Sequence, residues 1–217
     1  RLVQAAGAPP GMLIAMRDCA FYSAVLAGPG FAAISGQLEL LRECGVKPLR
    51  VLREQPELVV DCDGQHAWQV ADALTDLAVD LFRRTGIGTI IAHNVVACEE
   101  LRVVAGLAER MNLSASAIMD GDSARVSVAA RSSTAPSVLD QVRNKGVTVE
   151  AAVWWSLYHA SHDALAPDSF ESRRHAGTIR VEADGRIIGR NDEDETDLSL
   201  LTSDASRLRA GTTASAI

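Results

Sequence analysis

Aromatic residues are scarce in this chain, where they make up 4% of 217 residues. Hydrophobic residues still reach 47%, so the core has to be built from Ala, Val, Leu and Ile, a composition that suits helices packed on a sheet. Basic stripes are also lacking, and the net charge is −7. Because phosphate binding requires clustered Lys and Arg, this composition argues against nucleic acid as a partner. The length allows one large domain or two small ones.

Long apolar runs and a secretion leader are missing as well. No stretch approaches the roughly 18 apolar residues that span a bilayer, and no charged-then-apolar segment with a cleavage site opens the sequence. We therefore expect no membrane association and a cytoplasmic location. The four cysteines are far apart and form no CxxC pair, so reduced and mostly buried thiols are expected, with neither a zinc site nor a disulfide framework.

Periodicity predicts an α/β fold: a mixed sheet with helical crossovers. Apolar residues at steps of three and four, bounded by Gly and Pro, predict helices over residues 11–27, 31–43, 66–84, 99–112 and 149–160. Short apolar runs predict strands over residues 58–61, 89–92, 114–119 and 125–129, with turns at 62–64 and 120–122. Strands alternating with helices are typical of a sheet with helical crossovers.

Two boundaries are predicted along the chain. Residues 1–131 are expected to form helices plus an α/β core, and the loop SSTAPS follows at 132–137. Residues 132–201 are expected to add a helix and a β-hairpin, 178–188, whose Asp184-Gly185 step favours a tight turn, packed on the same core. The Ser-, Thr- and Ala-rich stretch 202–217 is expected to be a disordered tail.

The helix predicted at 149–160 contains three large aromatic residues. Trp154, Trp155 and Tyr158 lie on or near one face, so core packing is the first expectation. Adjacent tryptophans cannot both point the same way, and one is therefore expected to face a partner subunit or a second domain.

Residues 59–113 resemble the cofactor-side core of the non-Rossmann malate/L-lactate/ureidoglycolate-type dehydrogenases. VVDCDG corresponds to a V-D-G-D-G-like turn of that family. After a helix, GIGTIIAHNVVACE corresponds to G-I-G-V-V-A-V-R-N-S-x-H-F-G, and a second helix follows. The resemblance implies the dehydrogenase fold, an NAD(P) cofactor and a homodimer.

The polar residues of that family are lost at the first matching site. In the family, a Ser-His-Gly motif relays a proton, and an Arg three residues after its Gly anchors the substrate carboxylate. The matching positions hold Gly28, Pro29 and Gly30, and the Arg position holds Ala33. Pro cannot relay a proton and Ala cannot bind a carboxylate. No catalytic residue is therefore expected at Pro29 or Ala33.

At the second matching site only one family residue is kept. Asn94 remains as a candidate cofactor-binding residue, but Ala97 replaces the His that lies against the cofactor. Glu99 replaces the Gly that admits close approach, and its charge would repel a pyrophosphate. No bound cofactor is therefore expected.

Three further stretches resemble a set of bacterial proteins without an assigned function that are themselves similar to these dehydrogenases. They are residues 6–11 with 28–30, residues 147–154, and residues 167–173. This resemblance implies no activity.

These residues favour a catalytically inactive relative of the dehydrogenases that binds a small metabolite or a partner enzyme. Arg173, Arg174 and His93 are its candidate ligand anchors. The alternative is an NAD(P)-dependent oxidoreductase on small 2-hydroxy or 2-imino acids, with its acid/base relocated to His93 or His66. A third possibility is an enzyme of another class that uses the two arginines.

No metal site is predicted. His159 and His162 are three residues apart and share a helical face, with Asp163 next to them, but a third ligand at useful spacing is not evident. Surface or capping histidines are the expected role. The pairs Asp61/Asp63 and Asp120/Asp122 flank glycines and are expected to be turn residues.

Overall fold

The computed structural model describes residues 1–26, 28–132, 136–164, 180–181 and 187–188. The chain divides into two compact units, Arg1–Leu165 and Ala166–Ile217. The boundary predicted at residue 132 falls inside the first unit. Arg173, Arg174 and the stretch from residue 202 lie outside the described residues.

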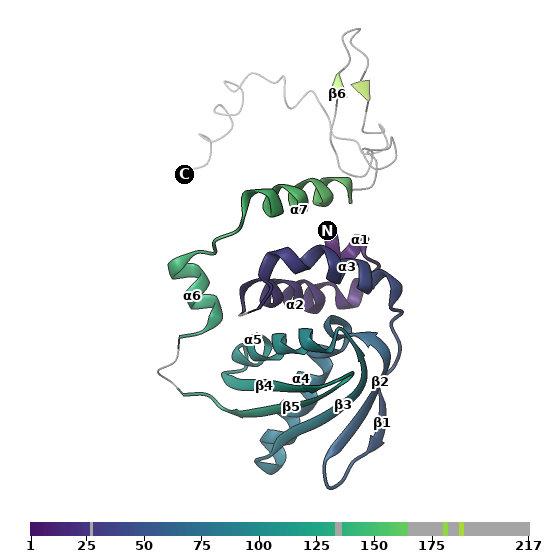
Figure 1. The fold of residues 1–217 in the computed structure, drawn as a ribbon, viewed down its shortest axis with the longest axis vertical. Coiled ribbons are helices and arrows are strands. Elements are labelled where there is room, and N and C mark those ends of the chain that lie inside the picture. Colours follow the sequence, from purple (N-terminus) through teal and green to yellow (C-terminus); the bar gives the residue numbers. More distant parts are fainter. Residues whose placement is uncertain (27, 133–135, 165–179, 182–186, 189–217) are drawn as a thin grey trace, which may run out of the picture. The chain divides into compact units, whose positions relative to one another are not determined.

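The first unit contains a five-stranded mixed sheet with the strand order β1-β2-β3-β5-β4 (Figure 1). Its strands are β1 (Arg50–Arg53), β2 (Leu58–His66), β3 (Gly88–Val96), β4 (Leu113–Asp120) and β5 (Ser123–Ala130). Strands β2 and β3 are parallel, and the other neighbours are antiparallel. The α/β class and the mixed sheet are as predicted, while β1 was not predicted.

The helices of the first unit follow the predicted pattern with two additions. They are α1 (Leu2–Ala5), α2 (Leu13–Val25), α3 (Ile34–Glu43), α4 (Ala67–Thr85), α5 (Val104–Glu109), α6 (Val138–Lys145) and α7 (Ala151–Asp163), with 3₁₀ turns η1 (Pro10–Met12), η2 (Gly30–Ala33) and η3 (Cys98–Val103). Neither α1 nor α6 was predicted. Among the described residues, no helix is long and apolar enough to cross a membrane.

Helices pack on one face of the sheet. Helix α4 contacts β3 and β5, α5 contacts β4, and α2 packs in turn on α4 and α5 (Figure 1). Alternate strand residues such as Ile90, Ala92 and Val126 point into this core and are fully buried. In β3 and β5 the residues that alternate with them, His93 among them, point to the opposite face and are only half-buried or exposed.

The turn predicted at residues 62–64 is wrong, because β2 continues through it as a bulge. Asp63 and Gly64 have left-handed φ angles of 52° and 72°, and the register with β3 shifts between Asp61 and Gln65. Two extra residues are absorbed in β2 without ending the strand, and the strand then leads directly into α4.

In the second unit, the described residues include the two strands of the predicted hairpin. β6 (Arg180–Val181) and β7 (Ile187–Ile188) pair in antiparallel fashion, with Val181 opposite Ile187. The residues between them lie outside the described part of the chain.

Candidate functional site

The carboxyl ends of the parallel strands β2 and β3 enclose a cavity of about 340 Å³. This edge is where α/β sheets commonly bind ligands. Its lining residues come from the β2 bulge, the end of β3 and the β4–β5 turn: Asp63, Gly64, Asn94, Val95, Val96 and Asp122.

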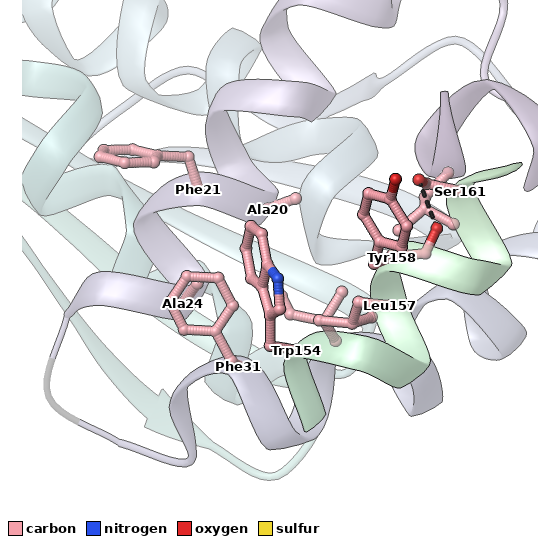
Figure 2. Close-up of a pocket in the computed structure, with 10 residues that line it drawn as sticks. Ala20, Phe21, Ala24, Phe31, Trp154, Leu157, Tyr158 and Ser161 are labelled. Atoms are coloured by element: carbon pink, nitrogen blue, oxygen red, sulfur yellow. Dashed lines mark hydrogen bonds between the residues drawn. The ribbon is translucent and has the colours of Figure 1, made fainter. Parts of the chain in front are cut away.

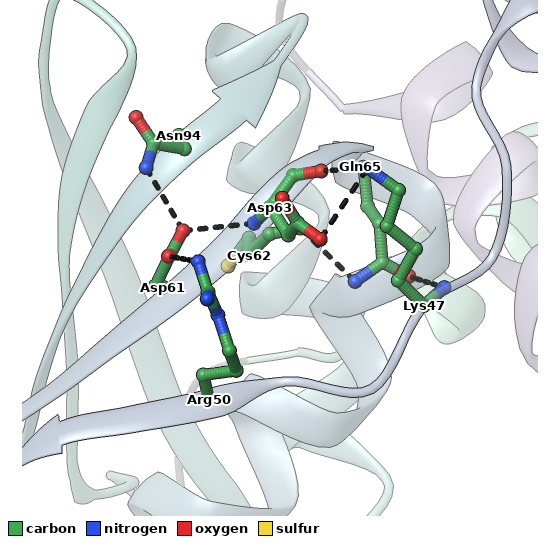
Figure 3. Close-up of polar contacts among 7 residues, drawn as sticks. All are labelled: Lys47, Arg50, Asp61, Cys62, Asp63, Gln65 and Asn94. Atoms are coloured by element: carbon green, nitrogen blue, oxygen red, sulfur yellow. Dashed lines mark hydrogen bonds and ion pairs between the residues drawn. The ribbon is translucent and has the colours of Figure 1, made fainter.

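Asp61 ties the two strand ends together (Figure 3). Its carboxylate accepts hydrogen bonds from Asn94 Nδ2 at 2.8 Å and from the backbone N–H of Asp63 at 2.9 Å, and it pairs with Arg50. The bond from Asn94 and then the one from Asp63 stabilise the charged form and lower the pKa of Asp61 to about 2. The side-chain amide of Asn94 therefore has a partner inside the protein, and its predicted cofactor contact stays a prediction.

Lys47 fixes the bulge next to this pair of strands (Figure 3). Its backbone N–H donates to Gln65 Oε1 at 2.9 Å, and its Nζ donates to the carbonyl oxygen of Asp63 at 2.8 Å. Gln65 in turn donates from Nε2 to the Cys62 carbonyl at 3.0 Å. These bonds hold Asp63 in its left-handed conformation.

The segment after β3 is also left-handed at two non-glycine residues. Asn94 has a φ of 57° and Ala97 a φ of 54°. The conformation of Ala97 costs about 1–2 kcal/mol, because a Cβ crowds the following carbonyl oxygen. It is followed at once by η3, whose first turn contains the exposed Glu99. A negative charge there interacts favourably with the free N–H groups of a helix start.

His93, a candidate acid/base and ligand anchor, lies on the sheet face opposite α4. Its Nδ1 is 2.7 Å from Ser123 Oγ, and Ser123 donates to Asp122 Oδ1 at 3.1 Å. A hydroxyl has one hydrogen, so the Ser123 oxygen accepts from the Nδ1–H of His93.

His66, the other proposed acid/base, is completely buried at the start of α4. Its Nδ1 accepts from the Trp68 N–H at 3.1 Å, and its Nε2 therefore donates to Gln37 Oε1 at 2.9 Å. Gln69 completes a capping box, because its side-chain oxygen accepts a hydrogen bond from the His66 N–H at 2.8 Å. Burial lowers the pKa of His66 to about 4. His66 is thus a neutral helix cap without access to a substrate.

The loop Gly28-Pro29-Gly30 is in contact with the side chain of Arg102 from η3. A Cβ on Gly28 would lie 3.2 Å from Arg102 Cζ. Arg102 donates to Ser23 O at 3.1 Å and to Glu100 Oε1 at 2.9 Å. The space beside this loop is therefore filled by a charged pair. Pro29 itself is exposed and Ala33 is half-buried.

The sequence did not reveal the Glu100–Arg102 pair. Glu100 is fully buried and also accepts from Trp68 Nε1 at 3.0 Å. The prediction assumed one α-helix over residues 99–112, whereas residues 98–103 form a 3₁₀ turn with 120° per residue. That geometry turns Glu100 inward together with Leu101 and Val103.

A second, apolar cavity of about 310 Å³ lies between α2, η2 and α7 (Figure 2). It is lined by Leu2, Ala20, Phe21, Ala24, Phe31, Ile34, Trp154, Leu157, Tyr158 and Ser161. None of these side chains carries a charge. Sequence analysis did not predict this cavity, because its walls come from segments more than 100 residues apart.

The prediction that the aromatic residues of α7 are core is wrong. Trp154, Trp155 and Tyr158 are 50%, 54% and 42% exposed. Helix α7 packs against η2 within the first unit, and its aromatic residues border the cavity or project from it. Trp154 and Tyr158 line the cavity, whereas Trp155 stacks on His159 with ring centroids 6.0 Å apart.

His159 and His162 are exposed on α7. The ring of His162 lies 4.6 Å from that of Tyr158. Within the described ranges, no cluster of three or more His, Cys, Asp or Glu side chains is placed to hold a metal ion. The four cysteines are free, and Cys19, Cys62 and Cys98 are buried, as expected for thiols in a core.

No protein-family model matches this chain, and no curated protein matches it either. Among solved structures, the malate dehydrogenase from Pyrococcus horikoshii OT3 is similar to part of it, with a TM-score of 0.45 and 18% identity. The match covers 63% of this chain and 45% of the dehydrogenase, so the chain spans less than half of that protein's length.

Proposed function

We propose that this chain binds a small molecule and does not transfer hydride. The observation that carries the proposal is the position of the imidazoles near the sheet. His66 is sealed inside the protein as a helix cap, and His93 lies on the sheet face opposite the helices. Neither can relay a proton at the loop of residues 28–30, which is on the helix side.

Two further contacts support this proposal. Arg102, already paired with Glu100, fills the space beside Gly28. The side-chain amide of Asn94 donates a hydrogen bond to Asp61, so this N–H is not available to a cofactor. Hydride transfer to or from a carbonyl needs a proton relay and a carboxylate anchor, and the residues at the matching loop supply neither.

The test is a titration of the protein with NADH and with NADPH, followed by thermal shift and by nucleotide fluorescence. We expect no stabilisation and no fluorescence change with either nucleotide up to about 1 mM, a limit that corresponds to about −4 kcal/mol of binding free energy. A dissociation constant in the micromolar range would contradict the proposal.

The oxidoreductase alternative has its own test in the variant His93→Ala. If the wild type oxidises small 2-hydroxy acids, or reduces 2-imino acids, and His93→Ala loses that turnover while keeping NADH binding, the relocated acid/base is correct. The variant Asn94→Ala is compared with it, because Asn94 is the next residue of β3 and lines the cavity at the strand ends, and its replacement removes no imidazole.

A further inference from the structure

We propose that the ligand of this protein is an uncharged, mainly aromatic molecule of about two fused rings, bound in the cavity between α2, η2 and α7. This inference rests on the proposed binding function and adds the place and the class of ligand. It does not concern the cavity at the ends of β2 and β3, whose polar groups already bind one another.

The size of the cavity sets the size of the ligand. Its volume is about 310 Å³. A cavity of about 150 Å³ lined by apolar side chains takes one benzene molecule. The space between α2 and α7 therefore holds a molecule the size of naphthalene or indole, at the lower end of the range typical of small-molecule sites.

The walls of the cavity set the chemistry of the ligand. Phe21 and Phe31 contribute from the side of α2 and η2, and Trp154 projects from α7 beside Phe31 (Figure 2). Aromatic walls favour an aromatic guest, because pairs of aromatic rings attract one another beyond the burial of their apolar area. Half the surface of Trp154 is exposed although the ring borders an apolar hollow. A guest in this hollow would bury that surface.

One polar group of the ligand can also be satisfied at this site. Among the described residues, the indole N–H of Trp154 and the hydroxyl of Tyr158 have no hydrogen-bond partner. Ser161 donates to the Tyr158 carbonyl at 2.7 Å and keeps its oxygen lone pairs for a donor. A ligand with a single hydroxyl, amine or carbonyl group at its edge matches these groups.

The charge around the cavity argues against an ionic ligand. An adjoining hollow shares Leu2, Ala20, Ile34 and Ser161 with it and includes Arg1 and Arg17. Arg17 is 68% exposed and pairs with Asp18 at 2.7 Å. Among the described residues, no charged side chain lines the apolar cavity itself, and transferring an anion into it would cost the solvation of that charge.

The experiment compares two fluorescent dyes built on the same two fused rings. 1-Naphthol is uncharged at neutral pH, whereas naphthalene-1-sulfonate has the same rings and a negative charge. We expect the uncharged dye to bind at a single site with a dissociation constant in the micromolar range and the sulfonate to bind at least tenfold more weakly. Equal or tighter binding of the sulfonate would overturn the proposed ligand class.

Matched variants locate the site. Trp154→Ala removes a wall of the cavity, and Ala20→Phe fills it from α2 without removing any wall. Each is expected to weaken binding of the uncharged dye at least tenfold, or about 1.4 kcal/mol. Trp155→Ala is the control, since Trp155 is equally exposed on the same helix but does not line the cavity. Circular dichroism and thermal melting check that each variant is folded.

The outcomes separate this proposal from the one on which it rests. Unchanged dye binding in Ala20→Phe, or an equal loss in Trp155→Ala, would overturn the site. If dye binding falls as the protein concentration rises, a second copy of the chain covers the cavity. This result would also overturn the proposed site. A protein that binds neither the uncharged dye nor NADH refutes only this inference, whereas binding of NADH refutes the proposed function.

Discussion

At the scale of single residues, His66 links the pH of the solution to the stability of the fold. Its imidazole is neutral when folded, because one ring nitrogen accepts from the Trp68 N–H and burial lowers its pKa from 6.5 to about 4. The unfolded chain therefore binds a proton at a higher pH than the folded one. Stability from this residue is complete above pH 6.5 and is lost as the pH falls towards 4.

The prediction concerns the free energy of unfolding measured by urea titration between pH 7 and pH 4. We expect His66 to account for a loss of about 3 kcal/mol over this interval. His66→Asn keeps a residue that caps helices well but does not titrate, so this part of the pH dependence should disappear. His93→Asn is the control and should retain it. An identical pH profile for His66→Asn and the wild type would show that the cap does not titrate as described.

Asp61 titrates at a lower pH than His66, so it does not contribute to the loss of stability assigned to His66. Its pKa is lowered from 3.8 to about 2, so its contribution is present above pH 3.8 and is lost only as the pH falls towards 2. Between pH 6.5 and pH 4 the carboxylate stays charged and its bonds to Asn94 and Asp63 remain.

The loss of a relay at Pro29 and of an anchor at Ala33 stays a prediction, which rests on what these side chains cannot do. Sequence reasoning could not assign hydrogen-bond partners that are distant in the sequence. Asp61 was assigned to a turn, whereas its carboxylate bonds Asn94 across two strands. No local pattern predicts a bond between residues 33 positions apart.

At the scale of elements, helices α2 and α5 touch through a glycine. A Cβ placed on Gly106 of α5 would lie 2.1 Å from Tyr22 Cδ1 of α2, which no relaxed structure tolerates. Gly106→Ala is therefore expected to lower the free energy of unfolding by about 1–3 kcal/mol, because the ring and the helix must move apart. Urea denaturation followed by circular dichroism measures this loss.

Two further variants show whether close approach is the cause. Gly36→Ala, in α3, meets nothing within 4 Å and is expected to stabilise the protein by up to about 1 kcal/mol, as helical Gly→Ala changes do. In a Tyr22→Leu background the aromatic ring is absent, so Gly106→Ala should lower the free energy of unfolding by clearly less. An equal cost in both backgrounds would rule out the Tyr22 contact as the source.

Helix α4 shows the strongest sequence signal, a regular apolar period over 19 residues; it ends at the left-handed Gly86 and lies where it was predicted. Strand β1 is exposed at all four residues, so no alternation marks it, and it was not predicted. Among their described residues, helices α6 and α7 both lack buried side chains, yet only α7, which has an apolar and aromatic run, was predicted. An apolar run in the sequence therefore predicts an element even where the folded chain leaves it exposed.

At the scale of the whole molecule, strand β4 forms an unprotected edge of the sheet. Its eight residues pair regularly with β5, and within the described residues they pair with no other strand. The sequence LSASAIMD contains neither Pro, Lys nor Arg, and β4 has no bulge, although edge strands usually use such features to prevent pairing with another chain. An antiparallel edge can pair with its own copy across a two-fold axis.

The homodimer expected from the resemblance to the dehydrogenases is still a prediction, and the β4 edge is where we expect it to form. Ile118 is 69% exposed on this strand, and Ile118→Lys adds a charge next to its own copy across the two-fold axis. Sedimentation velocity should show a dimer for the wild type and a monomer for Ile118→Lys. Ile87→Lys is the matched control, because Ile87 is 71% exposed but precedes the central strand β3, which is not an edge of the sheet. A wild type that stays monomeric at about 100 μM would exclude a dimer stronger than roughly −5.5 kcal/mol and with it this pairing. A dimer that survives Ile118→Lys but not Ile87→Lys would place the contact away from the β4 edge.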